Sequence, residues 1–394
     1  MPIEPRPARD WTLRAGALAA CCLLAPARAG AAAPELKATI EGAPEIVFSP
    51  KRDACDGNDV PDVNARAFRG ADGAVSMFAL HYVNRALRGP DLDHLKIDCA
   101  VALGSGFKAD PAEYNDQSWI AATWTPDGKR VAALVHHEYH GDRHGKCDAS
   151  KGKPGLACWY NTIVPAASAD GGRVFEKLPG VVAAPPFRQE FNSGWHRGFF
   201  NPSNIFRSGD FYYMYALTTG WEKQPAGACL FRDADPLRPD GWRAFDGKAF
   251  SIHYEDPYRV AASSPAPCAA IAPFQSAVGA VARHSSGAWL AVMQSWKDAG
   301  AFPVSGFYYA TSRNLTEWSE PRLLLATKTL FDDACGADRL RSYPSLLDPD
   351  STDRNFMTTG DRPWLYYADM RIDGCAHTSD RSLTRARLRV APAK

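Results

Sequence analysis

The feature that most constrains the fold is a pair of short segments that recurs five times along the chain. In each copy a stretch suited to a β-strand is followed by a turn, with glycine in four of the five, and then by a second strand rich in tyrosine or small apolar residues. The second strands are expected at 75–82, 130–136, 211–217, 289–294 and 364–369. Helical periodicity is hard to find, so the pattern predicts an all-β chain.

The spacing of these pairs indicates how many strands each unit has. The intervals are 53, 83, 73 and 68 residues, measured from Arg66, Trp119, Pro202, Gln275 and Tyr343. They exceed the roughly 40–50 residues of ordinary propeller blades, so we expect four-stranded units with long loops. A two-sheet sandwich would instead show short strands at even spacing. The sequence favours a five-bladed β-propeller at 55–390, preceded by a lead-in segment at 30–54.

A second motif recurs in the outer part of these units. Residues Ser168–Phe175 fit the serine–x–aspartate–x–glycine–x–x–aromatic turn known as an Asp box, and Ser312–Trp318 is a relative of it. A looser copy lies at Asp235–Trp242. In such turns side-chain oxygens bind backbone N–H groups while the aromatic packs between sheets. We expect a structural role for all three.

The N-terminus has the composition of an export signal. Arg6, Arg9 and Arg14 precede an apolar run at 15–25, and Ala27-Arg28-Ala29 fits a small-residue cleavage site. The run is shorter than the roughly 20 apolar residues that a membrane span needs. Residues 1–29 are therefore predicted to be a signal peptide of a secreted or periplasmic protein. A lipoprotein anchor at Cys21 is less favoured, because the apolar stretch before it is short.

The remaining cysteines predict disulfides, and the balance of charges argues against a nucleic-acid-binding protein. Export implies an oxidising compartment, so eight cysteines outside the signal predict four disulfides. Local pairings are expected: Cys55–Cys99, Cys147–Cys158, Cys229–Cys268 and Cys335–Cys375. The chain has 45 Lys and Arg against 44 Asp and Glu, and it lacks the basic surplus of a nucleic-acid-binding protein. No partner among nucleic acids is expected, and no membrane contact beyond export.

The repeats resemble those of a known group of enzymes. The segments at 201–213 and 311–318, with their Ser-Gly turn, tyrosine-rich strand and Ser-x-Asn-Leu-x-x-Trp turn, resemble the five-bladed propeller glycosidases. That group includes arabinanases, β-xylosidases, invertases and levansucrases, and the likeness is distant and closest in kind to glycoside hydrolase family 43. Sialidases also carry Asp boxes but have six blades. The resemblance implies a carbohydrate substrate, and we expect a monomer.

Propeller topology predicts where a ligand would bind. First strands start, and second strands end, at the same mouth of the central channel. The first-strand starts are expected at 59–62, 116–119, 197–201, 275–276 and 341–343. The second-strand ends are expected at 81–85, 136–140, 218–221, 294–297 and 366–369. These positions collect carboxylates, imidazoles, amides and aromatics, which suit the hydroxyls and the C–H faces of sugars.

Two carboxyl groups in different environments are what glycoside hydrolysis needs. Asp62 and Glu138 are the candidates, and the resemblance implies that Asp62 is the base or nucleophile. Alternation places Arg66 on the strand face of Asp62, where we expect it to hold that carboxylate ionised or to bind substrate. The structural alternatives are a buried ion pair at Asp62 and a loop salt bridge at Glu138.

The third blade departs from the pattern of those glycosidases. They carry an acid Glu at its start, where this chain has Asn201-Pro202-Ser203. Either Glu138 or Glu190 has taken over that role, or the activity differs. Asp116 loosely matches the third acidic residue of the group, which modulates the pKa of the acid.

Nine residues expected at the channel mouth are candidates for sugar binding, and the same region allows two alternative functions. Substrate binding is predicted for Arg66, His81, Trp119, His137, Asn201, Ser203, Gln275, Arg341 and Tyr343. No cofactor or metal is expected, with one alternative: a calcium or other divalent ion in the histidine-rich segment 136–144, serving a metal-dependent lyase or hydrolase. The other alternative is a sugar-binding propeller without catalysis.

Overall fold

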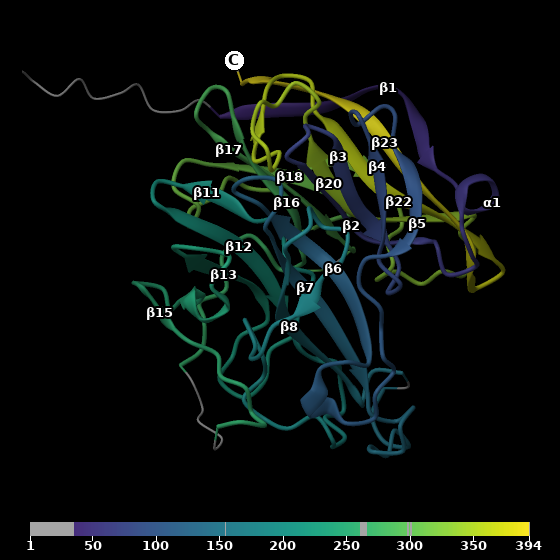
Figure 1. The fold of residues 1–394 in the computed structure, drawn as a ribbon, viewed down its shortest axis with the longest axis vertical. Coiled ribbons are helices and arrows are strands. Elements are labelled where there is room, and N and C mark those ends of the chain that lie inside the picture. Colours follow the sequence, from purple (N-terminus) through teal and green to yellow (C-terminus); the bar gives the residue numbers. More distant parts are fainter. Residues whose placement is uncertain (1–34, 154, 261–265, 298, 300–301, 394) are drawn as a thin grey trace, which may run out of the picture. The chain divides into compact units, whose positions relative to one another are not determined.

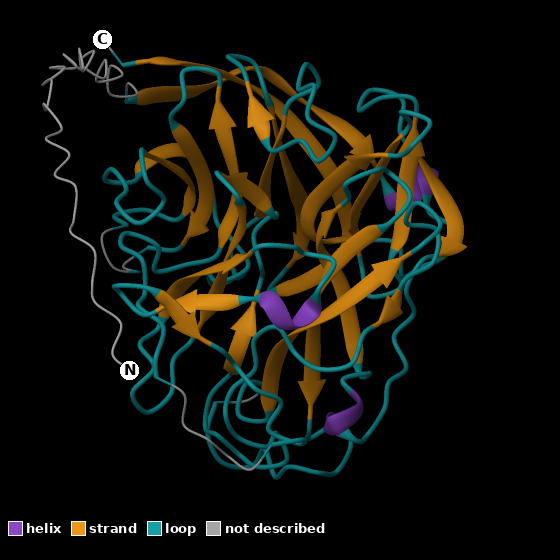
Figure 2. Ribbon diagram, turned by 60° about the vertical axis from the view of Figure 1, so that its left-hand side comes forward, coloured by secondary structure: helices purple, strands orange, loops and turns teal. Residues whose placement is uncertain are grey.

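The computed structural model describes residues 35–393, except 154, 261–265, 298, 300 and 301. Strands dominate this part of the chain, and its helical structure is limited to α1 (Pro50–Asp53) and two 3-10 turns, Pro111–Glu113 and Pro239–Gly241 (Figures 1 and 2). Within it, no helix is long and apolar enough to cross a membrane. The predicted signal peptide at 1–29 lies outside the described residues.

The antiparallel strand pairings divide into five units, four of which are built mainly from strands that follow one another in the chain. The first unit has the order β2 (Pro61–Arg69), β3 (Val75–Leu80), β4 (Arg85–Gly89) and β5 (Lys96–Val101). The second has β6 (Gln117–Trp124), β7 (Val131–His140), β8 (Trp159–Ser168) and β9 (Glu176–Lys177).

The third and fourth units repeat this arrangement. The third has β10 (Arg197–Phe200), β12 (Phe211–Thr218), β13 (Gly227–Asp233), β14 (Arg243–Phe245) and β15 (Phe250–Ile252), with β11 (Phe206–Ser208) beside β12. The fourth has β16 (Val278–His284), β17 (Trp289–Ser295), β18 (Gly306–Ser312) and β19 (Arg322–Ala326), with β21 (Thr358–Thr359) parallel to β16. A short parallel pairing of β8 with β10 links the second and third units.

The fifth unit is built from both ends of the chain. It comprises β20 (Arg339–Leu347), β22 (Trp364–Asp373), β23 (Ala376–Pro392) and β1 (Leu36–Phe48). Strand β1 pairs along β23 from Leu36 opposite Pro392 to Phe48 opposite Leu383, and Figure 1 shows the two side by side. It covers what would otherwise be an open sheet edge. The boundaries predicted at 55 and 390 were therefore too narrow, because the lead-in is a blade strand.

The first, second, fourth and fifth units meet through their first strands. Strand β2 packs against both β6 and β20, and β20 packs against β16. Apolar clusters fill the space between units, such as the one that joins Trp124 of β6 to Phe199 of β10 and to Trp242. Strand β8 of the second unit pairs with β10 of the third, and β12 of the third contacts β16 of the fourth. These five antiparallel units are the blades that the repeats predicted.

The Asp-box turns have the bonds that their sequence predicts. Ser168 Oγ accepts the Gly172 N–H at 2.9 Å, and Asp170 Oδ1 accepts the Arg173 N–H at 2.9 Å. Phe175 is buried in the cluster between the first two blades. In the related turn the rings of Trp318 and Phe274 lie 5.0 Å apart. The predicted structural role is confirmed for both turns.

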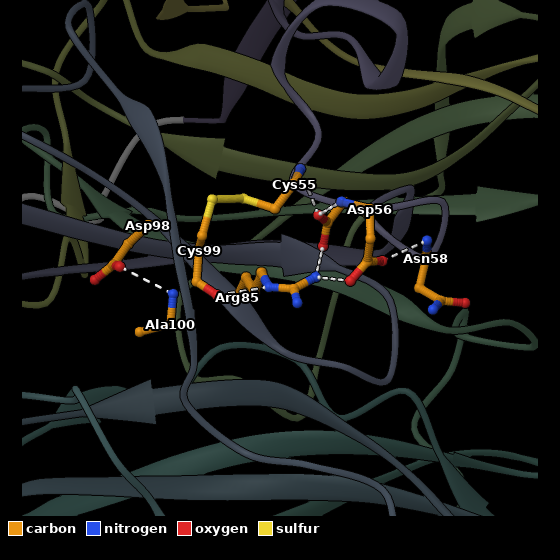
Figure 3. Close-up of a disulfide and its surroundings, with 8 residues drawn as sticks. Cys55, Asp56, Asn58, Arg85, Asp98, Cys99 and Ala100 are labelled. Carbon is orange, nitrogen blue, oxygen red and sulfur yellow. Dashed lines mark hydrogen bonds and ion pairs between the residues drawn. A yellow bond between two sulfur atoms is a disulfide. The ribbon is translucent and has the colours of Figure 1, made fainter.

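All four predicted disulfides are present: Cys55–Cys99, Cys147–Cys158, Cys229–Cys268 and Cys335–Cys375. The first ties the segment before β2 to the outermost strand of its own blade (Figure 3). Beside it, Arg85 forms ion pairs with Asp56 at 2.7 Å and Asp59 at 2.9 Å. This crosslink and ion cluster hold the start of the first inner strand, which carries Asp62.

Candidate functional site

The strand registers bring the predicted residues to one end of the blades. Pro61 pairs with Leu80, Gln117 with Glu138, Phe199 with Thr218 and Arg341 with Asp369. Each pair joins the start of a first strand to the end of a second strand. The mouth expected from topology is therefore formed, and we call Asp62 and Glu138 on it the carboxylate pair.

Asp62 is enclosed by three side chains from different strands. Arg381 Nη1 on β23 lies 2.5 Å from Asp62 Oδ1, and the Tyr343 hydroxyl on β20 donates to the same oxygen at 3.4 Å. His81 Nε2, just after β3, lies 3.3 Å from Oδ2. The Asp62 side chain keeps 16% of its surface exposed.

The surroundings of Asp62 disfavour its charged form. Burial raises the pKa of Asp62 to about 6, and the negative charge of Glu138 adds to the rise, against the attraction of Arg381. Burial also lowers the pKa of His81 to about 4, with help from the positive Arg381. His81 is therefore neutral near pH 6 and supplies no second cation, so Asp62 can carry a proton at that pH.

Glu138 lies at the end of β7 in the opposite electrostatic environment. His136 Nε2 is 2.9 Å from Glu138 Oε1, and His140 Nε2 is 3.4 Å from Oε2. Burial alone would raise the pKa of Glu138, but the hydrogen bonds from these two imidazoles outweigh it and lower the pKa well below its usual value. The pair thus combines a carboxyl that retains its proton with one that loses it readily.

The third blade orients His136 through its backbone. The Asn201 N–H donates to His136 Nδ1 at 3.1 Å, so in the neutral ring the proton lies on Nε2. Nε2–H can then donate to Glu138 Oε1. Asn201 has a φ of 48°, in the left-handed region that non-glycine residues rarely adopt. The first strand of this blade is correspondingly interrupted, with β10 ending at Phe200 and β11 beginning at Phe206.

Trp119 connects the two halves of the site. Its ring lies 5.7 Å from His81, the neighbour of Asp62, and 5.8 Å from His136, the neighbour of Glu138. Both contacts are edge-on. The pair, its imidazoles and this tryptophan therefore form one continuous cluster at the mouth.

Sequence reasoning missed a stacked layer behind Glu138. The ring of Trp159 stacks on His196 at 4.0 Å and on His140 at 5.1 Å. His196 Nε2 is hydrogen-bonded to Asn161 Oδ1, and burial lowers the pKa of His196 to about 3. His196 directly precedes the first-strand start expected at 197–201, so a window one residue wider would have included it.

Arg66 does not fill the role that alternation predicts. It is 2% exposed, and its guanidinium donates to the carbonyls of Ala121 at 2.7 Å and Pro202 at 3.0 Å. The register of β2 shifts between Pro61 and Arg66, and such a bulge breaks the alternation on which the prediction rested. Arg381 stands beside Asp62 instead.

Arg381 was missed because only first and second strands were considered. In the fifth blade, Asp369 of β22, which pairs with Arg341 at the mouth, also pairs with Ser382 of β23. The third strand of a blade therefore begins at the same mouth where the second ends. Extending the topological rule to third strands would have pointed to Arg381.

Three other predicted binding residues are not brought to the pair. His137 is fully buried, and its Nε2 accepts the Asp116 N–H at 3.0 Å on the far side of β7. Ser203 is also buried, and its Oγ accepts the Tyr215 N–H at 3.0 Å. Gln275 is exposed in the loop before β16. The first two serve the strand framework.

Two further candidates lie near the mouth with protein partners. Asp116 is buried, and its Oδ2 lies 3.2 Å from the His140 N–H and 3.0 Å from His144 Nε2, so it supports the end of β7. Arg341 forms an ion pair with Asp369 at 3.1 Å. Neither has a described contact with the carboxylate pair.

Glu190, the alternative general acid, and the histidine-rich segment 136–144, the alternative metal site, both have protein partners in the structure. Glu190 accepts a hydrogen bond from the Tyr258 hydroxyl at 3.1 Å and forms an ion pair with Arg188 at 2.9 Å, and these contacts hold two loops together. Among the residues that the structure describes, no group of three or more His, Cys, Asp or Glu side chains is arranged to hold a metal ion. The histidines of 136–144 contact Asp116 and Glu138 instead.

No protein-family model matches the chain, and no curated protein matches it in sequence. Among solved structures, the chain is similar to a thermostable family-43 glycoside hydrolase, with 12% identity and a TM-score of 0.46 over 85% of this chain and 94% of the other. The catalytic domain of a Coprinopsis cinerea family-62 α-L-arabinofuranosidase is 9% identical, with a TM-score of 0.46 over 90% and 97%.

A protein of unknown function from Dyadobacter fermentans is also similar, with 9% identity and a TM-score of 0.47 over 90% of this chain and 99% of the other. Two glycosidases and a protein of unknown function are thus among the solved structures to which the chain is similar.

Proposed function

We propose that the chain is a glycoside hydrolase whose catalytic groups are Asp62 and Glu138. The observation that carries the proposal is the contrast within the carboxylate pair: burial and charge disfavour ionisation of Asp62, whereas two imidazoles favour ionisation of Glu138. Pairs of carboxyl groups in opposed environments are the means by which glycosidases divide acid and base roles at one pH.

The environments assign the roles in reverse of what the resemblance implied. With a pKa of about 6, Asp62 is suited to donate a proton to the leaving oxygen. Glu138 stays ionised and is suited to activate water or to attack the sugar. Tyr343 and His81 would hold Asp62 in place, and His136 would do the same for Glu138.

The proposed reaction uses these side chains and water. Asp62 transfers its proton to the glycosidic oxygen as the C–O bond breaks, and Glu138 takes the proton of the attacking water or forms a glycosyl ester that water later cleaves. The anomer of the first product, read by NMR, distinguishes the two routes.

The proposal is tested with aryl α-L-arabinofuranosides and aryl β-D-xylopyranosides. Asp62→Asn and Glu138→Gln should each lower kcat by about 10²–10⁴-fold, the usual contribution of acid–base groups. Asp127→Asn, in an exposed turn between β6 and β7, is the matched control and should keep full activity. Both pair variants at wild-type activity, with normal folding, would exclude the assignment.

Leaving-group chemistry separates the two roles. A dinitrophenyl leaving group departs without protonation, so Asp62→Asn should regain most of its activity on that substrate. Glu138→Gln should stay inactive, because the base or nucleophile is still needed. The opposite pattern would show that Glu138 is the acid, as in the first of the sequence-based alternatives.

Sugar binding without catalysis is the second candidate. It is favoured by the 2.5 Å ion pair of Asp62 with Arg381 and by Asn201 standing where the related glycosidases carry a carboxylate. It predicts glycan binding by calorimetry with no product from either substrate class.

Export is part of the proposed function. Four disulfides are typical of proteins outside the cytosol. We propose a secreted or periplasmic monomer that meets its carbohydrate substrate there. Mass spectrometry of the secreted chain should give an N-terminus at residue 30, and a lipid-modified Cys21 would contradict it.

A further inference from the structure

Phe107 is an exposed aromatic in a costly backbone conformation. It lies in the loop between β5 and β6, and 52% of its surface is exposed. Its φ of 49° falls in the left-handed region, where a Cβ is unfavourable and glycine is the usual residue. Neither burial nor backbone geometry explains a phenylalanine here, and such strain tends to persist where a ligand is held.

The loop that carries Phe107 is pinned at several points. The Phe107 N–H donates to the Asp116 carbonyl at 3.1 Å, and the Gly106 N–H donates to Asn115 Oδ1 at 3.2 Å. Lys177 Nζ binds Asn115 Oδ1 at 3.1 Å and the Tyr114 carbonyl at 2.7 Å. The ring is therefore presented by a fixed scaffold, which lowers the entropy cost of using it as a binding surface.

An unbroken aromatic path joins Phe107 to the carboxylate pair. The ring of Phe107 meets Tyr82 edge-on at 5.4 Å, and Tyr82 meets Trp119 edge-on at 5.7 Å. Tyr82 also lies 3.9 Å from the ring of His81, which contacts Asp62. Because a fourth strand ends and the next first strand begins at the mouth, this loop belongs to the same face as the pair.

We infer that Phe107 forms a second sugar subsite, which binds a ring of the oligosaccharide that extends outward from the carboxylate pair. This inference rests on the proposed function for the identity of its ligand. A rigid aromatic face beside a polar site suits the C–H face of a pyranose or furanose ring, whose hydroxyls stay in water. The chemical class is therefore a neutral oligosaccharide longer than the unit held at Asp62.

The subsite is tested by titration calorimetry in the Asp62→Asn background, in which the ligand should be consumed far more slowly. The probes are α-1,5-linked arabinose and β-1,4-linked xylose oligomers, each from monosaccharide to pentasaccharide. Phe107→Ala should raise Kd for the longer oligomers by about 3–10-fold, as expected for one aromatic contact, and should leave the monosaccharide Kd unchanged. Phe107→Tyr should restore the length dependence.

Phe211→Ala is the matched control, since that half-buried ring lies at the opposite end of the third blade. It should leave every Kd unchanged. A Kd for long oligomers that is indifferent to Phe107→Ala, or no rise in affinity with length in the parent protein, overturns the subsite. So does an equal loss for the monosaccharide.

Aryl monoglycoside hydrolysis separates this outcome from that of the proposed function. Phe107→Ala should cleave these substrates at the parent rate, because they do not reach the subsite. Turnover without an effect of Phe107 on oligomer binding refutes the subsite alone. Phe107-dependent binding without any turnover refutes the hydrolase and keeps the subsite.

Discussion

Replacing Asp62 with asparagine should stabilise the protein at neutral pH. The pKa of Asp62 is raised from its usual 3.8 to about 6, so ionisation is less favourable in the folded than in the unfolded chain. A rise of about two units, at 1.36 kcal/mol each, means that about 3 kcal/mol of stability present below pH 4 is lost once the pH exceeds 6. Asparagine cannot ionise and avoids that loss.

Glu138→Gln should have the opposite sign. The pKa of Glu138 is lowered, so its charge stabilises the folded state above the usual value of 4.5, and this contribution is lost as the pH falls through the lowered value. Glutamine removes the contribution, so the variant should be less stable than the parent at pH 7. The difference should shrink toward acid.

Both variants are measured by calorimetric melting at pH 4 and pH 7. For a chain of this size, about 3 kcal/mol corresponds to a rise in Tm of about 4 °C for Asp62→Asn at pH 7. The gain should nearly vanish at pH 4. A loss of stability at pH 7, or a gain of equal size at both pH values, would refute the reasoning that burial dominates the environment of Asp62.

Two other substitutions test the neighbours of the pair, and a third tests the strained backbone at Phe107. Arg381→Met removes the cation beside Asp62, so the alkaline limb of the pH–rate profile should move to a pH about one to three units higher. The control Arg389→Met, on the exposed part of β23, should leave this limb where it is. His136→Ala should shift the acidic limb of the pH–rate profile to higher pH, because Glu138 loses a hydrogen-bond donor. His136→Gln should reverse part of that shift. An acidic limb that does not move would contradict the contact between His136 and Glu138. Phe107→Gly should raise the midpoint of urea unfolding, because glycine avoids the cost of about 1–2 kcal/mol that a side chain adds in the left-handed backbone region. A lowered midpoint would contradict the idea that the backbone at Phe107 is strained.

The blades and disulfides were predictable because their signals are local. A Gly turn between two strands, or a pair such as Cys147–Cys158 joined by a short loop, is readable within a few tens of residues. The pairing of β1 with β23 joins opposite ends of the chain, and nothing near Leu36 in sequence indicates its partner. That strand was therefore assigned to a lead-in.

The part of the site that follows from blade topology and from the regular alternation of side chains along a strand was predictable. Asp62, Glu138 and Tyr343 were placed at the mouth by the rule for strand starts and ends, and the structure brings them together. Arg66 was misplaced, because one bulge in β2 turned it toward the carbonyls of neighbouring blades. A bulge of this kind depends on the packing of adjacent sheets and has no signal in the strand sequence.

The third blade shows a limit of reasoning from side chains alone. Asn201 stands where the glycosidases that the repeats resemble carry a carboxylate, and that difference by itself argued against catalysis. In the structure its backbone N–H sets the tautomer of His136, and the imidazole in turn holds Glu138 ionised. The blade therefore still acts on the carboxylate pair, through a main-chain donor that many residues could supply. The absence of an acidic residue at Asn201 is thus compatible with a two-carboxylate site in which Asp62 is the acid.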